Sequence, residues 1–263
     1  DPLVRKYYSN LSRDKLIDVL DKICEEKITE AINQSCNQLA DYTNAFQKKI
    51  IFKREAIAER GLWVAKKRYA LNVYDNEGVR YKEPKLKVMG LEIVRSSTPA
   101  PVRASLKEAV RLALTTDEKT LQSFIEHTRM LFNKFEPEEI AFPRGVNGLM
   151  KYTSGADIYS KGTPMHVRGA LMYNHLLRKN KLDKKYEVIQ EGEKIKFLYL
   201  KEPNHIRENC IAFIGKIPKE LDIHRYVDYN TMFEKSFLEP IKQIIEGLGW
   251  KTEVTASLED LFA

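Results

Sequence analysis

Apolar residues in the first part of the chain change their spacing once, from a helical period to runs typical of strands. From position 16 to position 39 they recur at intervals of three and four, as on one face of an α-helix. These residues are Leu16, Leu20, Ile23, Cys24, Ile28, Ala31, Ile32, Cys36 and Leu39. With Ser12 and Asp14 as a suitable start, the pattern predicts one long amphipathic helix that ends near Tyr42.

Three strand-like runs follow this helix: IIFKREAIA, LWVAKKRYALNVY and VRYKEPKLKVMG. The last two are separated by DNEG, and Asn and Gly in a short connection favour a β-hairpin. A helix followed by a small antiparallel sheet predicts an α+β fold for residues 1–90. The composition changes at SSTPAP, so we expect a domain boundary near Gly90 and a second domain over residues 91–263.

The second domain is expected to be mainly helical, with a few short strands. Thr98 is a candidate cap for its first helix, with Pro99 in the first helical position, and a second helix is expected from Asp117. Residues 137–164 are rich in Gly and Pro and predict irregular structure. Further expected elements are a helix in HVRGALMYNHLLRKN, a strand pair around Glu191–Gly192, a short strand in CIAFIG, and a last helix that Pro240 kinks or divides.

The composition favours a polyanionic partner and a reducing compartment. Lys and Arg number 44 against 37 Asp and Glu, which gives a net charge of +7. Three cysteines without a CxxC pair predict reduced, buried thiols, and five scattered histidines indicate no zinc site. No apolar stretch reaches the ~20 residues that a membrane span needs. The chain shows no signal peptide and no initiator Met, which predicts a piece of a longer protein.

The run KKRYALN places Lys66, Lys67 and Arg68 inside an apolar segment, where adjacent charges require water or a counter-charge. If the run is one strand, Lys66 and Arg68 lie on one face, and Lys67 and Tyr69 lie on the other. Alternate residues ~6–7 Å apart would match the phosphates of a nucleic-acid strand. The structural alternative is a solvated edge strand whose lysines prevent aggregation.

Basic residues gather at two further places. The first group brackets an apolar run before SSTP, whose hydroxyls and helix-start N–H groups suit a phosphate, although a plain helix cap is the alternative. This group consists of Lys85, Lys87 and Arg95. The second group lies where a loop enters a helix, and its alternative is a purely structural role. It consists of Lys161, His166 and Arg168.

The chain ends in SLEDLFA, where apolar anchors are spaced as in a short peptide that docks into a groove of a partner. These anchors are Leu258, Leu261 and Phe262. A tail that frays or folds back on the body is the alternative. Motifs of catalysis are missing: GxxxxGK[ST], GxGxxG after a strand and a nucleophile elbow do not occur. The acidic pairs are expected on solvated faces, so the sequence predicts no catalytic site and no metal site in this chain.

The order and spacing of several segments resemble the C-terminal part of a family B DNA polymerase of the T-even bacteriophage replicative type. The segments are REAIA, KKRYALN, EPKLKVMGLE, SSTP, HVRGALMYN, CIAF, KSFLEPI and SLEDLFA, and they cover nearly the whole chain. The resemblance implies a partial palm over residues 1–90, made of the long helix and the small antiparallel sheet. A thumb over residues 91–263 follows. The implied enzyme is a DNA-directed DNA polymerase, a nucleotidyltransferase of DNA replication in the cytoplasm of an infected bacterial cell.

The resemblance also implies roles for single residues. In the palm, Lys67 and Arg68, positioned by Tyr69, would contact the primer–template near its growing 3′ end, with Lys66 as a weaker candidate. Basic positions at the palm–thumb junction match Lys87 and Arg95. In the thumb, the element that touches the primer backbone matches His166 and Arg168, and Lys161 lies in the same group. The clamp-binding tail matches Leu258, Leu261 and Phe262.

The metal-binding aspartates of the family, in a DxxSLYP run and a DTDS run, are absent from this sequence, as is the KxxxNSxYG run of the fingers. The chain is therefore expected to bind primer–template DNA but to be inactive alone. In the complete polymerase, Mg²⁺ would bind carboxylates of the N-terminal remainder. Such a chain is either the natural C-terminal half of a polymerase encoded in two pieces or an artificial truncation.

Two other interpretations stay open at this point. One is a non-enzymatic nucleic-acid-binding module whose tail docks on a protein partner, and the other is a basic α+β domain without a nucleic-acid role. The polymerase interpretation further expects the cations to converge on one concave track and to be free of acidic neighbours.

Overall fold

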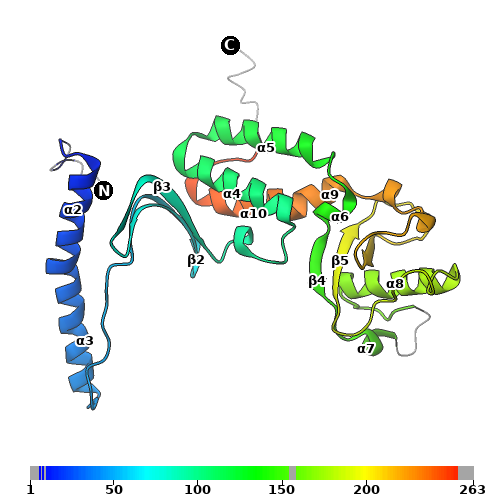
Figure 1. Cartoon of the computed structure of the whole chain (residues 1–263), viewed down its shortest axis with the longest axis horizontal. Helices are drawn as coiled ribbons and strands as arrows, with labels where there is room; N and C mark the ends of the chain where they lie inside the picture. Colours follow the sequence, from blue (N-terminus) through cyan, green and yellow to red (C-terminus); the bar gives the residue numbers. More distant parts are fainter. Residues whose placement is uncertain (1–5, 7, 9, 154–157, 254–263) are drawn as a thin grey trace, which may run out of the picture. The chain divides into compact units, whose positions relative to one another are not determined.

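Figure 1 shows the computed structural model, which describes Lys6, Tyr8 and residues 10–153 and 158–253. The chain divides into two compact units. Unit 1 contains residues 1–61 and 70–87, and unit 2 contains residues 62–69 and 88–263. The described elements are helices and two three-stranded sheets, with strand orders β1-β2-β3 and β4-β5-β6. The expected α+β fold is confirmed.

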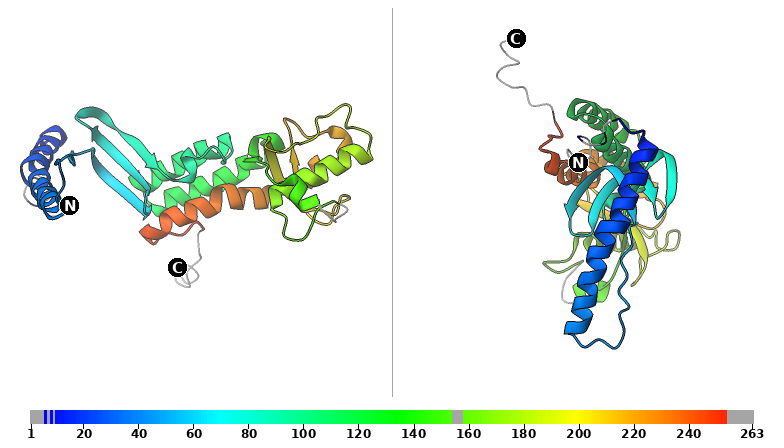
Figure 2. Two further views of the ribbon diagram at one scale, coloured as in Figure 1. Left: turned by 90° about the horizontal axis from the view of Figure 1, so that it is seen from below. Right: turned by 90° about the vertical axis from the view of Figure 1, so that its left-hand side faces the viewer.

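A long amphipathic helix opens unit 1, as the apolar spacing predicts. It runs through α2 (Arg13–Ile23), the π-helical η1 (Cys24–Thr29) and α3 (Glu30–Tyr42) without a break. The chain then returns beside this helix before it enters the first sheet (Figures 1 and 2). Arg54, at the end of the returning segment, pairs with Asp21 of the helix at 2.5 Å and with Asp75 of the sheet at 2.7 Å. This largely buried guanidinium links the three parts of unit 1.

The first sheet consists of β1 (Ala56–Ala65), β2 (Arg68–Asn76) and β3 (Val79–Met89). The hairpin expected at DNEG is confirmed: Glu77 and Gly78 connect β2 to β3 with φ of 52° and 86°, the backbone of a tight two-residue turn. The single strand expected through KKRY is wrong. Lys66 and Lys67 instead form a second tight turn, between β1 and β2, because the apolar residues on either side belong to two antiparallel strands.

A helical layer forms the first part of unit 2. It contains η2 (Glu92–Val94), α4 (Ala100–Thr115) and α5 (Glu118–Phe132), and α10 (Glu239–Ile245) packs against α4 (Figures 1 and 2). The start of α5 is as expected, because the Asp117 side chain accepts a hydrogen bond from Thr120 N at 2.9 Å. Thr98 is not the cap of α4: the cap position is Pro99, and no side chain bonds to the helix start.

The last helix is continuous, but its hydrogen-bonding pattern changes directly before Pro240. It consists of α9 (Tyr229–Phe233), the π-helical η5 (Glu234–Leu238), α10 and the 3₁₀ turn η6 (Glu246–Leu248). Pro240 lies in the first turn of α10, and because it has no N–H the preceding turn widens to the π form.

The second sheet consists of β4 (Phe142–Gly145), β5 (Lys194–Tyr199) and β6 (Cys210–Phe213), and both strand pairs are antiparallel. Two sequence expectations were wrong here. Residues 187–190 form no strand, and β5 pairs instead with β4, in the segment that Gly and Pro marked as irregular. The expected strand in CIAFIG and helix in HVRGALMYNHLLRKN are β6 and α8 (Met165–Lys179).

Helix α8 packs closely on β6, and short elements complete unit 2. A Cβ atom at Gly169 would lie 2.8 Å from Ala212 N, so the helix reaches the strand only because this residue is glycine. The short elements are α6 (Pro137–Ile140), α7 (Leu149–Thr153), η3 (Lys219–Leu221) and η4 (His224–Tyr226).

The expectation that all three cysteines are buried is met only in part. Cys210 is buried, but Cys24 and Cys36 are half-buried, because the helix that carries them is covered on few sides. Within the described ranges, no helix is long and apolar enough to cross a membrane.

Candidate nucleic-acid interface

The connection between β1 and β2 presents adjacent cations to solvent. We define the basic turn as Lys66, Lys67 and Arg68. The two lysine side chains are exposed, and Lys67 has a φ of 60°, in the left-handed region that costs a non-glycine residue about 1 kcal/mol or more. A lysine held in this conformation depends on the surrounding structure to keep it there.

Gly90 provides that support. It follows β3 with a φ of 66°, and a Cβ atom built on it would lie 2.2 Å from the carbonyl oxygen of Lys67. The backbone of the basic turn therefore rests directly on the backbone of Gly90. The sequence analysis named Gly90 only as a domain boundary and gave it no role in the site, although a glycine directly after a strand is a recognised signal of close backbone approach.

A carboxylate fixes the third cation of the turn. Arg68 donates from Nη2 to both oxygens of Glu92, at 3.0 and 2.9 Å. Arg95 pairs with the same carboxylate at 3.2 Å and donates to the carbonyl oxygen of Gly90 at 3.2 Å. Glu92 therefore binds two guanidinium groups and stabilises the conformation of the turn. This leaves the ammonium groups of Lys66 and Lys67 as the exposed charges of the basic turn.

Lys87 lies in unit 1 and is also held internally. Its ammonium group pairs with the carboxylate of Glu55 and donates to Asn76 Oδ1 at 2.8 Å. The neighbouring cation of the same sequence group, Lys85, lies over the ring of Tyr81 at 4.1 Å. Tyr69, at the start of β2, is half-buried.

The group around α8 contains a buried polar cluster. Arg168 donates to Asn209 Oδ1 and lies 3.5 Å from the carboxylate of Glu208, which is only 7% exposed. Glu208 also accepts a hydrogen bond from the hydroxyl of Tyr159. Burial and this carboxylate raise the pKa of Tyr159 to about 12. The Arg168 side chain thus joins α8 to the segment before β6.

His166 lies two residues earlier on α8 and is half-buried. Burial lowers its pKa, and the nearby guanidinium of Arg144 on β4 lowers it further. His166 is therefore neutral at pH 7 and can contribute a hydrogen bond rather than a charge. Lys161, in the loop before α8, is exposed. Sequence reasoning missed Arg144, because it lies in the segment that was expected to be irregular.

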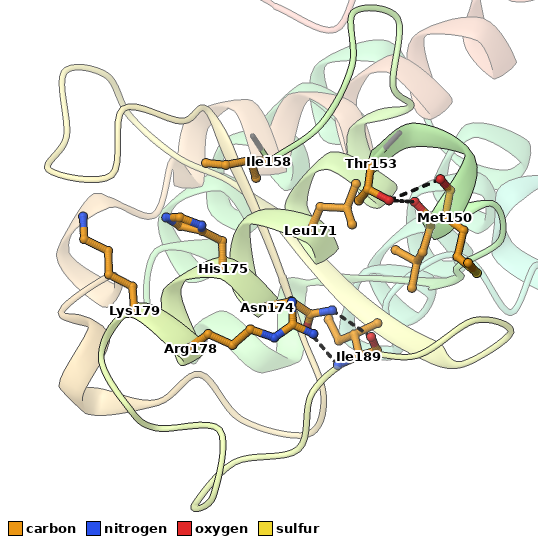
Figure 3. Close-up of a pocket in the computed structure, with 10 residues that line it drawn as sticks. Met150, Thr153, Ile158, Leu171, Asn174, His175, Arg178, Lys179 and Ile189 are labelled. Carbon is orange, nitrogen blue, oxygen red and sulfur yellow. Dashed lines mark hydrogen bonds between the residues drawn. The ribbon is translucent and has the colours of Figure 1, made fainter. Parts of the chain in front are cut away.

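The outer side of α8 borders a hollow of about 730 Å³ (Figure 3). His175, Arg178 and Lys179 line it together with apolar side chains such as Leu171 and Met150. Asn174 anchors its floor by exchanging hydrogen bonds with the backbone of Ile189, at 2.8 and 2.9 Å. The cations predicted from the sequence do not line this hollow.

The predicted DNA-binding residues therefore fall into separate groups: the basic turn with Arg95 and Tyr69, Lys87 in unit 1, and the α8 group of Lys161, His166 and Arg168. The expectation that the cations are free of acidic neighbours is wrong for Arg68, Lys87, Arg95 and Arg168, because each is paired with a carboxylate. Glu92 and Glu208, which make three of these pairs, carried no signal in the sequence. Leu258, Leu261 and Phe262 lie outside the described residues.

Known proteins similar to this chain are DNA polymerases of bacteriophages. The DNA-directed DNA polymerase of Escherichia phage RB69 is 36% identical over 277 aligned residues, which cover 100% of the chain and 30% of that polymerase. The DNA-directed DNA polymerase of Enterobacteria phage T4 is 33% identical over 262 residues, which cover 95% of the chain and 29% of that polymerase. No protein-family model matches the chain.

These similarities extend over the whole chain, whereas the chain spans about 30% of the length of the polymerases that it matches. The resemblance drawn from the ordered sequence segments is confirmed. The chain is therefore similar, over 95–100% of its length, to about 30% of a T-even-type phage DNA polymerase.

Proposed function

We propose that the chain is the C-terminal palm and thumb part of a family B phage DNA polymerase, with the palm in residues 1–90 and the thumb in residues 91–263, and that it binds the primer–template duplex. The observation that carries this proposal is the basic turn, in which two exposed lysines project from a turn that Gly90 and Glu92 hold rigid. The similarity to phage polymerases supports DNA as the anion that these lysines meet.

In this proposal Lys66 and Lys67 contact the sugar–phosphate backbone near the primer end. Contacts to phosphate position a protein on DNA without reading the sequence, which suits an enzyme that must copy every sequence. Arg68 and Arg95 act through Glu92 as positioning residues for the turn, and each becomes a direct contact only if DNA displaces the carboxylate. Arg168 has a comparable positioning role in the thumb, while the exposed Lys161 is a candidate contact and the half-buried His166 can offer a hydrogen bond.

The chemistry of nucleotide transfer is assigned to the remainder of the polymerase. Among the residues that the structure describes, no group of three or more His, Cys, Asp or Glu side chains could hold a metal ion. The described residues therefore do not fit an Mg²⁺ site, and we assign no catalytic step to this chain. We propose that it is inactive alone, and that mixing it with a polypeptide bearing the DxxSLYP and DTDS runs restores primer extension. Failure of every such mixture to extend a primer would contradict the reconstitution.

The binding proposal is tested by titrating the chain into a primer–template duplex at several salt concentrations. If about five phosphates are engaged, log K should fall with log salt at a slope near −4.5. A flat salt response, or no binding at low salt, would favour a basic domain without a nucleic-acid role. Equal affinity for two unrelated duplex sequences is expected, because the contacts are to phosphate.

The tail is proposed to dock on a sliding clamp in the infected bacterial cell through Leu258, Leu261 and Phe262. Deletion of residues 257–263 should abolish clamp binding and leave the affinity for duplex DNA unchanged, since the cations of the basic turn are retained. Clamp affinity can be measured by surface plasmon resonance with immobilised clamp. An unaltered clamp affinity after the deletion would refute this role.

A further inference from the structure

We infer that the long helix of unit 1 and the segment that returns beside it form the docking surface for the rest of the polymerase polypeptide. The groove between them takes a segment of that polypeptide with apolar side chains and a Lys or Arg. This inference rests on the proposed function, but it concerns a surface that the basic turn does not include.

The core of unit 1 is too small for a domain that stands alone. In its described part, the buried hydrophobic residues are Ile17, Ala70, Val73 and Tyr74. None of the residues of α3 is buried, although the helix is amphipathic. A helix gains most of its stability from burial of its apolar face. Unit 1 therefore needs further apolar contacts that the described chain does not supply.

A continuous run of chain exposes the apolar side chains that could make those contacts. Tyr42 is 87% exposed, Phe46 is 98% exposed and Ile51 is 73% exposed. We define the apolar face of unit 1 as Leu39, Tyr42, Phe46, Ile50, Ile51 and Phe52. Large apolar side chains that are exposed so densely along one segment mark an interaction surface, because a soluble protein rarely leaves so much apolar area in water.

The groove beside this face has a charge opposite to that of the chain as a whole. It has a volume of about 930 Å³, and four carboxylates line it against two cations, Lys53 and Arg54. Its walls also include Asn33 of the helix, and Ile51 and Phe52 of the returning segment. The carbonyl oxygen of the Asn33 side chain is buried and accepts no hydrogen bond from the described residues. An unsatisfied buried acceptor favours an incoming N–H group.

The carboxylates of the groove argue against DNA and for a protein segment. Asp21 and Glu55 are neutralised by Arg54 and Lys87, but Glu25 and Glu77 form no ion pair with a described residue. A phosphate backbone would be repelled from these carboxylates, whereas a Lys or Arg side chain would be attracted. The polymerases that the chain matches are more than three times as long as the chain, so most of such a polymerase lies outside it. This remainder is the partner that would cover the apolar face of unit 1.

The test uses the full chain and, as the probe, a polypeptide that comprises the remaining part of such a polymerase. The double variant Phe46→Glu/Ile51→Glu should weaken their association about 100-fold or more, measured by isothermal titration calorimetry, because two large anchors are lost from the interface. Both side chains are exposed in the isolated chain, so the variant should keep its fold. The matched control is Met130→Glu on α5, which is 62% exposed in unit 2 and should bind as the wild type does.

Two further measurements complete the test. Glu25→Lys should weaken the same association and make it less dependent on salt, because it reverses one charge of the groove. Hydrogen exchange in residues 30–55 should slow when the partner is added. Unchanged affinity of the Phe46→Glu/Ile51→Glu variant for the partner would overturn the inference. The inference would also be overturned if the chain alone self-associates and this variant abolishes that self-association, because the face would then bind a second copy of the chain. Duplex binding by the chain alone is recorded in parallel, so loss of DNA binding is recognised separately as failure of the proposed function.

Discussion

At the scale of single residues, Gly90 determines whether the basic turn can exist. The residue combines a positive φ with a contact in which any Cβ atom would overlap the carbonyl oxygen of Lys67. Lys67 itself adopts a left-handed conformation that its side chain disfavours. The turn is thus stabilised from outside rather than by its own residues.

Gly90→Ala should therefore destabilise the chain by about 1–3 kcal/mol and weaken duplex binding, because the turn must move away from the new methyl group. Urea unfolding followed by circular dichroism measures the loss. Gly247→Ala is the matched control: a Cβ atom there meets open space and φ is not positive, so stability should stay the same or rise slightly. Equal stability of Gly90→Ala and the wild type would show that the contact is not real.

His166 gives a pH-dependent prediction with a definite sign. Its pKa in the folded chain is lowered by burial and by Arg144, so folding favours the neutral ring. The resulting stability is present above the unfolded value near 6.5 and is lost as the pH falls through the lowered folded value. Between pH 7.5 and 5, the wild type should lose more unfolding free energy than His166→Gln.

Duplex binding distinguishes this electrostatic role from a direct charged contact. Because the ring is neutral at pH 7.5, His166→Gln should bind DNA as tightly as the wild type at that pH. A large loss of affinity at pH 7.5 would mean that His166 meets the phosphate as a cation, contrary to its environment in the structure.

At the scale of elements, the packing of α8 on β6 depends on Gly169. An alanine in a helix interior normally adds up to about 1 kcal/mol of stability over glycine. At Gly169 the added methyl group would lie 2.8 Å from Ala212 N and 3.0 Å from Ile211 C. We expect Gly169→Ala to lower the free energy of unfolding by about 1–3 kcal/mol, since the strand backbone cannot yield as a flexible side chain would. A stabilised variant in thermal unfolding would show that α8 does not approach β6 this closely.

The elements that the sequence predicted correctly are those whose signals are local. The cap at Asp117, the helical spacing of α8 and the Gly78 turn each depend on residues within a few positions of one another. The pairing of β4 with β5 joins residues more than fifty positions apart, such as Phe142 and Phe197, and no local pattern announces it.

The sequence predicted which basic residues belong to the candidate site, but not how they are arranged in space. The sequence identified Lys66, Lys67 and Arg68 as a group, yet it placed them on one strand, because apolar residues flank them on both sides. A two-residue turn with lysines in place of Asn and Gly gives no turn signal. The carboxylates of Glu92 and Glu208 come from other segments, so only the fold could show that they pair with Arg68 and Arg168.

At the scale of the whole molecule, some basic side chains are paired with carboxylates inside the fold, and others are exposed to solvent. The chain carries a net charge of +7, but Arg54, Arg68 and Arg168 form ion pairs with carboxylates that stabilise the fold. Net charge alone therefore overstates the number of cations that can meet DNA. The lysines that remain exposed at the basic turn are the ones whose removal should change the dependence of DNA binding on salt.

The most direct measurement of the central claim is the salt dependence of duplex binding for two charge-matched variants. Lys66→Ala/Lys67→Ala should make the slope of log K against log salt less steep by about 2 and weaken binding similarly for every duplex sequence. Lys107→Ala/Lys119→Ala removes the same charge from exposed positions on α4 and α5 and should leave the slope nearly unchanged. Identical slopes for the two variants would contradict the claim that the basic turn holds the primer–template.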